Sequence, residues 1–389
     1  MNKSLYAQDG VNVEAGDDFS KFAAEVTRST WGNCPFVEVH DHAAHNFRGP
    51  RSIKLVNLPP HFKLDIGADG VGTKTGLVTE ALSHRTSGWD LLAMGSTDIS
   101  RWGSLPVAFS NVLDVATLGE ADSQTRRCFK ELLLGLRDAA KRSRMVLYRG
   151  ETAELGSYVG SENPVAVTKY NWAGFALGIE HPHRVITGAE VKAGDVVVAL
   201  RDQGFRSNGL SSVRKAFALH FGKDNGGKWW ENPESKQALG EAVVPSTLYD
   251  SLFAAANGWM QMDFQPVVRI NAIVHVTGGG IPSKLGQDIL LPLGLSATLY
   301  DLWQPPPIMQ QCAEWRGMTD RDCYETWHGG QGALCIMSPE EEDLFLHMAK
   351  VEGVEAKVCG EVHQTPKWEQ PHFTIHSRFN DRVERWELN

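Results

Sequence analysis

Cysteine is scarce in this 389-residue chain: there are six, and no two of them form a Cys-x-x-Cys pair. This excludes a dense disulfide framework and predicts reduced, packed thiols in a reducing compartment such as the cytoplasm. The sequence also lacks an apolar run long enough to cross a bilayer, and its first residues are polar rather than signal-like. We therefore expect neither a membrane partner nor a secretory leader.

Positive charge is in deficit, with 38 Lys plus Arg against 47 Asp plus Glu and a net charge of −9. The deficit argues against a nucleic-acid partner, and an anionic substrate would need a local basic cluster or Mg²⁺. What is present is an ordinary globular composition, 42% hydrophobic and 22% charged. The length exceeds that of a typical single core, so we expect two domains, 1–180 and 181–389.

The most informative segment begins at residue 64. Residues 64–70 predict a strand that enters the turn Asp69-Gly70-Val71-Gly72-Thr73-Lys74, and a helix is expected from about residue 75. The glycines permit positive φ and close approach of a ligand, while helix N–H groups and the Lys74 ammonium suit a phosphate. The spacing differs from the standard phosphate loop, and the structural alternative is a tight turn with a solvated lysine.

Other predicted sites also lie where strands or helices end. Asp98 falls at the far end of the next helix, where a carboxylate could hold a divalent cation. Ser207 and Asn208 precede a helix predicted over 211–221, and they either cap it or bind a ligand. Three consecutive glycines, Gly278–Gly280, are costly to order, which predicts close approach of the backbone to another group. Strands alternating with helices indicate an α/β fold class.

Six short motifs in one order resemble a known family, the aminoimidazole ribonucleotide synthetases or phosphoribosylformylglycinamidine cyclo-ligases. The resemblance covers nearly the whole chain, and related ATP-binding enzymes include selenophosphate synthetase and thiamine-monophosphate kinase. The motifs are Gly10-Val11-Asn12-Val13-Glu14-Ala15-Gly16, Asp69–Lys74, Gly150-Glu151-Thr152-Ala153-Glu154, Ala173-Gly174-Phe175, Ser207-Asn208-Gly209 and His275-Val276-Thr277-Gly278-Gly279-Gly280.

The resemblance implies a two-domain fold whose N-terminal domain pairs across a homodimer into a β-barrel, followed by a C-terminal α/β domain. The implied reaction belongs to purine biosynthesis. ATP activates the formyl amide oxygen of formylglycinamidine ribonucleotide, an internal nitrogen closes the imidazole ring, and ADP and phosphate leave. Residues 1–20 are expected either to form a lid over phosphate or to be a flexible tail.

Site residues follow from the motifs together with their chemistry. We expect catalytic roles for Lys74, Asp69 and Glu151. ATP phosphates are expected at Gly70, Gly72, Thr73 and Lys74, and Mg²⁺ at Asp69, Asp98 and Asp114. The ribonucleotide substrate is expected at Ser207, Asn208, Gly278, Gly279 and Gly280.

The sequence also departs from the family pattern. Asn111 or Asp114 fills one expected carboxylate position, and other departures are Thr97, Asn171, Arg206, Thr247, Glu325 and His328. Lost carboxylates weaken metal binding, and lost cations weaken phosphate contacts. Two alternatives therefore stay open: a sibling enzyme that phosphorylates another small molecule, or a non-catalytic nucleotide-binding paralogue. One hypothesis is that Arg206 and His328 replace the lost cations.

Overall fold

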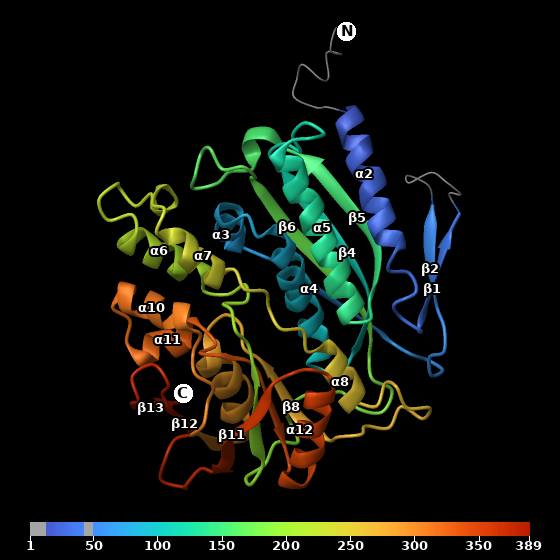
Figure 1. The fold of residues 1–389 in the computed structure, drawn as a ribbon. Helices are drawn as coiled ribbons and strands as arrows, with labels where there is room; N and C mark the ends of the chain where they lie inside the picture. Colours follow the sequence, from blue (N-terminus) through green and yellow to red (C-terminus); the bar gives the residue numbers. More distant parts are fainter. Residues whose placement is uncertain (1–12, 43–49) are drawn as a thin grey trace, which may run out of the picture. The chain divides into compact units, whose positions relative to one another are not determined.

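The computed structural model describes residues 13–42 and 50–389 (Figure 1). The chain divides into two compact units, Met1–Ser96 with Pro106–Ile179, and Thr97–Leu105 with Glu180–Asn389. The start of the Gly10–Gly16 motif and most of the expected lid lie outside the described residues.

The first unit contains a four-stranded sheet in the order β3-β6-β4-β5 and a separate two-stranded hairpin. β3 pairs antiparallel with β6, and β4 pairs parallel with β5. Its elements are α2 (Val13–Arg28), β1 (Val37–Asp41), β2 (Arg51–Leu55), β3 (Leu64–Gly70), α3 (Lys74–Ala81), α4 (His84–Ser100), β4 (Leu105–Val115), α5 (Gln124–Arg142), β5 (Val146–Glu154), η1 (Gly156–Tyr158) and β6 (Tyr170–Ile179).

Helices cover one face of this sheet (Figure 1). A Cβ added to Gly95 of α4 would lie 3.1 Å from the ring of Phe109 on β4, so the helix sits directly on the strand. α4 and α5 in turn cross with their backbones almost in contact. A Cβ on Gly88 would lie 2.1 Å from the Leu136 nitrogen, and one on Gly135 would lie 1.9 Å from the Arg85 carbonyl oxygen. Only glycine allows this crossing.

The opposite face of the sheet is apolar along β3 and β6. Register places Ile66 opposite Leu177 and Ala68 opposite Phe175, so these side chains share one face. Leu64, Ile66 and Phe175 are 55%, 67% and 46% exposed. Adjacent exposed hydrophobic side chains of this kind mark an interaction surface.

The second unit is built on a seven-stranded sheet in the order β13-β12-β9-β11-β7-β10-β8. Neighbouring strands are antiparallel except β12 and β9, which are parallel. Its elements are β7 (Val196–Arg201), α6 (Leu210–His220), η2 (Trp229–Glu231), α7 (Ser235–Ala242), α8 (Asp250–Ala256), β8 (Ile270–His275), η3 (Pro282–Leu290), α9 (Leu291–Leu293), β9 (Leu295–Leu299), α10 (Pro307–Arg316), α11 (Asp320–Thr326), β10 (Gln331–Met337), η4 (Pro339–Glu341), α12 (Glu342–Val351), β11 (Ala356–Gln364), β12 (His372–His376) and β13 (Val383–Glu387).

Hydrophobic cores lie on both faces of this larger sheet. Val197 and Ala199 of β7 pack toward η3, while Val198 and Leu200 pack toward α8 and α12. A strand buried on both sides reads as a continuous apolar run, which is how this one appears in the sequence. All six cysteines are buried and unpaired, as predicted. Among the described helices, none has the length and hydropathy needed to span a bilayer.

Candidate functional site

The glycine turn lies between β3 and α3, close to where the sequence predicts it. α3 begins at Lys74, its N-cap residue Thr73 makes no side-chain capping bond, and Gly72 has a φ of +55°. The first N–H groups of an uncapped helix suit an anion. The turn therefore has the backbone geometry expected of a phosphate site.

Lys74 does not extend into solvent from this turn. Its side chain is fully buried, and Nζ lies 2.8 Å from Oδ2 of Asp90, which is also fully buried. The solvated-lysine alternative is therefore wrong. Contact between Lys74 and a phosphate stays a prediction. The ammonium group would have to contact Asp90 and the ligand at the same time.

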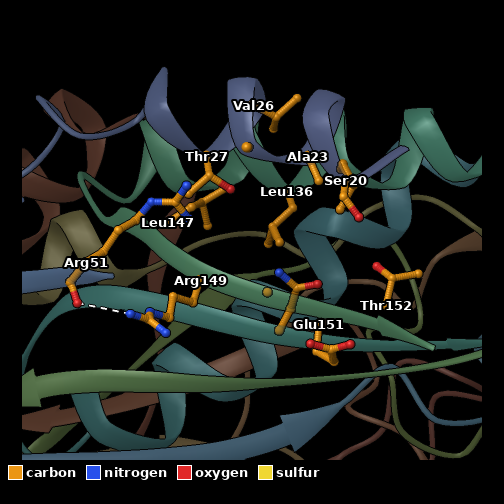
Figure 2. Close-up of a pocket in the computed structure, with 14 residues that line it drawn as sticks. Ser20, Ala23, Val26, Thr27, Arg51, Leu136, Leu147, Arg149, Glu151 and Thr152 are labelled. Atoms are coloured by element: carbon orange, nitrogen blue, oxygen red, sulfur yellow. Dashed lines mark hydrogen bonds between the residues drawn. The ribbon is translucent and has the colours of Figure 1, made fainter. Parts of the chain in front are cut away.

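A polar cavity of about 430 Å³ lies beneath α2 in the first unit (Figure 2). Arg51 and Arg149 lie at one end, and Glu151 and Thr152 lie toward the other. Nη2 of Arg149 donates to the Arg51 carbonyl oxygen at 3.0 Å. Two guanidinium groups suit phosphate, so one end of the cavity fits an anionic ligand. Thr152 pairs with the buried Leu113, whereas Glu151 pairs with Val112, so the carboxylate and the hydroxyl point to opposite faces of the sheet.

The two candidates for the missing family carboxylate face opposite sides of the sheet. Asn111 is buried on the helix-covered side, where its Oδ1 accepts a hydrogen bond from Trp172 Nε1 at 3.0 Å and its side chain lines the cavity. Asp114 is an odd number of residues from Asn111, so its side chain points to the other face of the strand, the face not covered by helices. Val112, which pairs with Glu151 of β5, points to that same face. The choice between Asn111 and Asp114 therefore decides on which side of the sheet the expected carboxylate position lies.

The three predicted metal residues do not form a ready cluster. Asp69 pairs with Gly174 of β6, and a Cβ added to Gly174 would meet the ring of Phe109 on the helix-covered face of the sheet. The Asp69 side chain therefore points to the helix-covered face, whereas the Asp114 side chain points to the opposite face. Asp98 lies in the second unit. Within residues 13–42 and 50–389, no three His, Cys, Asp or Glu side chains gather as metal ligands. A metal role for each residue stays a prediction.

A chain of buried polar groups reaches Asp98 within the second unit. Nη1 of Arg206 lies 2.7 Å from Oδ2 of Asp202, and Nη2 lies 3.0 Å from Nε2 of His275. Nδ1 of His275 lies 3.1 Å from Oδ1 of Asp98. Arg206 and His275 are fully buried, whereas the Asp98 side chain is 41% exposed.

The charge states along this chain follow from its surroundings. Burial lowers the pKa of His275 to about 4, although its hydrogen bond with Asp98 raises it. Burial would raise the pKa of Asp98, but the hydrogen bond with His275 and the charges of His275, Arg101 and Arg206 together hold that pKa below its usual value. Near pH 7, His275 is neutral and Asp98 is ionised.

The expected substrate residues divide into open and enclosed positions. The N-cap of α6 is Gly209 without a side-chain cap, so the capping alternative for Ser207 and Asn208 is wrong. The Ser207 hydroxyl is buried with no hydrogen-bond partner, which fits a group awaiting a ligand.

Within the triple-glycine turn, Gly278 and Gly279 are exposed. Gly280 has a φ of +61°, and a Cβ there would lie 1.8 Å from the Tyr324 carbonyl oxygen. The close approach predicted for this residue is thus to the protein's own backbone.

Replacement of the lost cations by Arg206 and His328 is wrong. The Arg206 guanidinium is enclosed, with Nη1 also donating to the Thr247 carbonyl oxygen at 3.1 Å. His328 is 3% exposed, and its ring bonds the Gly204 carbonyl oxygen and the Gly330 N–H at 2.8 and 3.0 Å. Neither side chain presents charge to a ligand.

Sequence reasoning missed three residues that shape these sites. Asp90, Arg149 and Asp202 each follow or interrupt an apolar stretch, which is the sequence signal that could have found them. Asp90 and Asp202 are buried, and a charged residue is seldom buried unless it is paired, whereas Arg149 is exposed.

Comparisons with known proteins identify the family of the chain. Family profiles described as AIR synthase related protein, N-terminal domain, and AIR synthase related protein, C-terminal domain, match residues 53–176 and 192–369. A phosphoribosylformylglycinamidine cyclo-ligase from Synechocystis sp. is 30% identical over 369 residues, 92% of this chain and 96% of the relative. One from Synechococcus elongatus is 32% identical, with the same coverage.

Solved structures show the same fold at low sequence identity. The hydrogenase maturation protein HypE of E. coli has a TM-score of 0.57 and 13% identity, covering 95% of this chain and 96% of its own. A HypE structure in complex with ATP has a TM-score of 0.53 and 12% identity, covering 85% and 87%.

Proposed function

The chain belongs to the phosphoribosylformylglycinamidine cyclo-ligase family, and we propose that it cyclises formylglycinamidine ribonucleotide to aminoimidazole ribonucleotide at the expense of ATP, in purine biosynthesis. One observation carries the proposal. The similarity to cyclo-ligases at 30–32% identity runs through both domains and covers 92% of the chain. The six unpaired cysteines support a cytoplasmic location.

The first unit would bind and activate ATP. The uncapped start of α3, with Gly70, Gly72 and Thr73, would hold phosphate through backbone N–H groups, and Lys74 would add a positive charge. Within the first unit, Glu151 with Asp69 or Asp114 would hold Mg²⁺ together with phosphate oxygens. That ion would neutralise the charge that develops on the transferred phosphoryl group. Asp98 of the second unit stays a separate candidate for a metal or substrate contact.

The second unit would bind the ribonucleotide. The Ser207 hydroxyl, which has no hydrogen-bond partner, and the Asn208 side chain would form hydrogen bonds with the ribonucleotide. The exposed Gly278 and Gly279 would let a polar group of the substrate approach the backbone. The γ-phosphoryl group of ATP passes to the formyl amide oxygen. The internal amidine nitrogen then forms the new C–N bond as phosphate leaves with that oxygen.

The protein is proposed to act as a homodimer. Leu64, Ile66 and Phe175 form an exposed apolar face on β3 and β6, and a second copy of this face would bury it.

A turnover assay tests the function. Addition of the amidine ribonucleotide to protein, ATP and Mg²⁺ should release one ADP for each imidazole product formed. Glu151→Gln should lower kcat by about 100-fold or more because it removes charge at the metal and phosphoryl group. Glu120→Gln, at an exposed turn position, is the matched control and should keep wild-type activity.

The alternatives give other results. ATP binding without any response to the amidine ribonucleotide would favour a sibling enzyme with another phosphoryl acceptor. Absence of ATP binding in the presence of Mg²⁺ would favour a non-catalytic paralogue.

A further inference from the structure

Arg206 has a backbone conformation that a long side chain rarely adopts. Its φ is +53°, in the left-handed region. The guanidinium donates to Asp202 and to the Thr247 carbonyl oxygen, while Asp202 also accepts from the N–H groups of Gly204 and Thr247 at 3.2 and 3.0 Å. A strained backbone conformation of this kind persists only where surrounding contacts hold the residue in place, and such residues cluster at functional sites.

The bond from Arg206 to His275 decides where the imidazole carries its proton. A guanidinium has donors and no acceptor, so Nε2 of His275 must be the unprotonated nitrogen that accepts. The proton of the neutral ring is then on Nδ1, which donates to Oδ1 of Asp98. Geometry alone therefore gives both the tautomer and the direction of the second hydrogen bond.

We propose that Arg206 is a positioning residue which, acting through the fixed tautomer of His275, holds the half-exposed carboxylate of Asp98 in the orientation that the reaction uses. The proposal rests on the proposed function, in which Asp98 serves the metal or substrate. Reversal of the ring tautomer would place a lone pair against the carboxylate, and the two would repel. A carboxylate that loses its donor rotates between rotamers and is no longer held in the geometry that the chemical step needs.

A purely structural role for Arg206, as the lock of the turn before α6, makes a different prediction. In that case the ring of His275 would not depend on Arg206, and a variant that kept the turn folded would keep activity. The two roles are separable because the donors to Asp202 and Thr247 are on Nη1, whereas the donor to His275 is on Nη2.

The tautomer can be read on the unmodified protein by ¹⁵N NMR with labelled histidine. The spectrum of His275→Asn, in which one ring signal is missing, identifies the signals of His275. We expect a protonated Nδ1 and an unprotonated Nε2. A ring with the proton on Nε2 would overturn the proposal, and this measurement does not require any Arg206 variant to fold.

Kinetics test the consequence for Asp98. Arg206→Gln ends two bonds short of both terminal nitrogens, so it loses the donors to Asp202 and Thr247 together with the donor to His275, and its effect is compared with that of the His275 variants below. We expect kcat to fall by about 10–100-fold, with KM for ATP changed by less than about twofold. Arg126→Gln is the matched control: Arg126 is equally buried and donates to the carbonyl oxygens of Leu118 and Gly119 in the first unit.

Two variants of His275 test the same proposal if Arg206→Gln proves unstable. His275→Asn keeps an N–H near the position of Nδ1 and should retain most of kcat, whereas His275→Leu should lose it to the extent seen for Arg206→Gln. Equal activity of the Asn and Leu variants would refute positioning through His275. If the wild type makes no imidazole product, the proposed function fails, while the tautomer still decides whether Arg206 controls His275.

Discussion

The Nζ atom of Lys74 lies 2.8 Å from Oδ2 of Asp90, and neither side chain reaches solvent. The residue expected to meet phosphate is thus also half of a buried ion pair. Such a pair adds little net stability, but loss of one partner leaves an uncompensated charge in the interior. Loss of activity in a Lys74 variant therefore has two causes to separate.

Asp90→Ala should lower the free energy of unfolding by about 3–5 kcal/mol, because the Lys74 ammonium stays buried without its partner. The double variant Lys74→Met/Asp90→Leu should recover most of that loss. Denaturant unfolding of the three proteins measures both effects. If the proposed role of Lys74 holds, the double variant is folded and releases no ADP; wild-type stability of Asp90→Ala would contradict the buried pair.

Gly135→Ala should destabilise the first unit by about 1–3 kcal/mol or more, because the new Cβ would overlap the Arg85 carbonyl oxygen. Thermal or denaturant unfolding checks this. Gly240→Ala in α7 is the control: nothing lies within 4 Å of its Cβ, so this variant should be unchanged or more stable by up to about 1 kcal/mol. Equal stability of the two variants would mean that α4 and α5 do not cross so closely.

His84 should make the protein less stable in acid. Its ring is buried, with Nε2 2.8 Å from the Thr168 hydroxyl, and burial lowers its pKa to about 4. The unfolded chain binds a proton below about pH 6.5, but the folded protein does so only near pH 4. The unfolding free energy therefore decreases as pH falls through that window, by up to about 3 kcal/mol from this residue.

Unfolding in urea at a series of pH values measures that slope. His84→Gln retains an amide that can bond Thr168 and has no proton to gain, so its curve should be flatter between pH 6.5 and 4. Parallel curves for the two proteins would show that His84 is not the cause.

Ile66→Asp should prevent self-association, because it places a charge in the apolar face of β3 and β6. Sedimentation velocity should find a dimer for the wild type and a monomer for this variant. Val165→Asp is the control; Val165 is more exposed, at 86%, but lies outside that face. A monomeric wild type would remove the homodimer from the proposal.

Local features were predictable from sequence where one short segment carried all the information. The turn from β3 into α3 was found because glycines and a lysine occur together, and α3 begins within one residue of the expected position. Its ionic partner could not be found, because Asp90 comes from the following helix and pairing depends on how α3 and α4 pack.

The face to which a strand residue points and the residue that caps a helix were harder to predict from the sequence. Sequence spacing could not decide between Asn111 and Asp114. Their side chains point to opposite faces of β4, and a bulge in the pairing of β4 with β5 cannot be predicted from spacing. The capping alternative for Ser207 and Asn208 failed because Gly209, in a left-handed conformation, is the N-cap residue of α6 instead. Burial of Arg206 likewise depends on residues distant in sequence.

The short segment Thr97–Leu105 belongs to the second unit although it is encoded amid the first. Ser100 donates to Oδ1 of Asp250 at 2.8 Å, and Trp259 Nε1 donates to the Gly103 carbonyl oxygen at 2.9 Å. A protein expressed from residue 180 onward would lack both partners, together with the acid that faces His275. The C-terminal half is consequently not a transplantable module: a graft or truncation must carry the end of α4 with it.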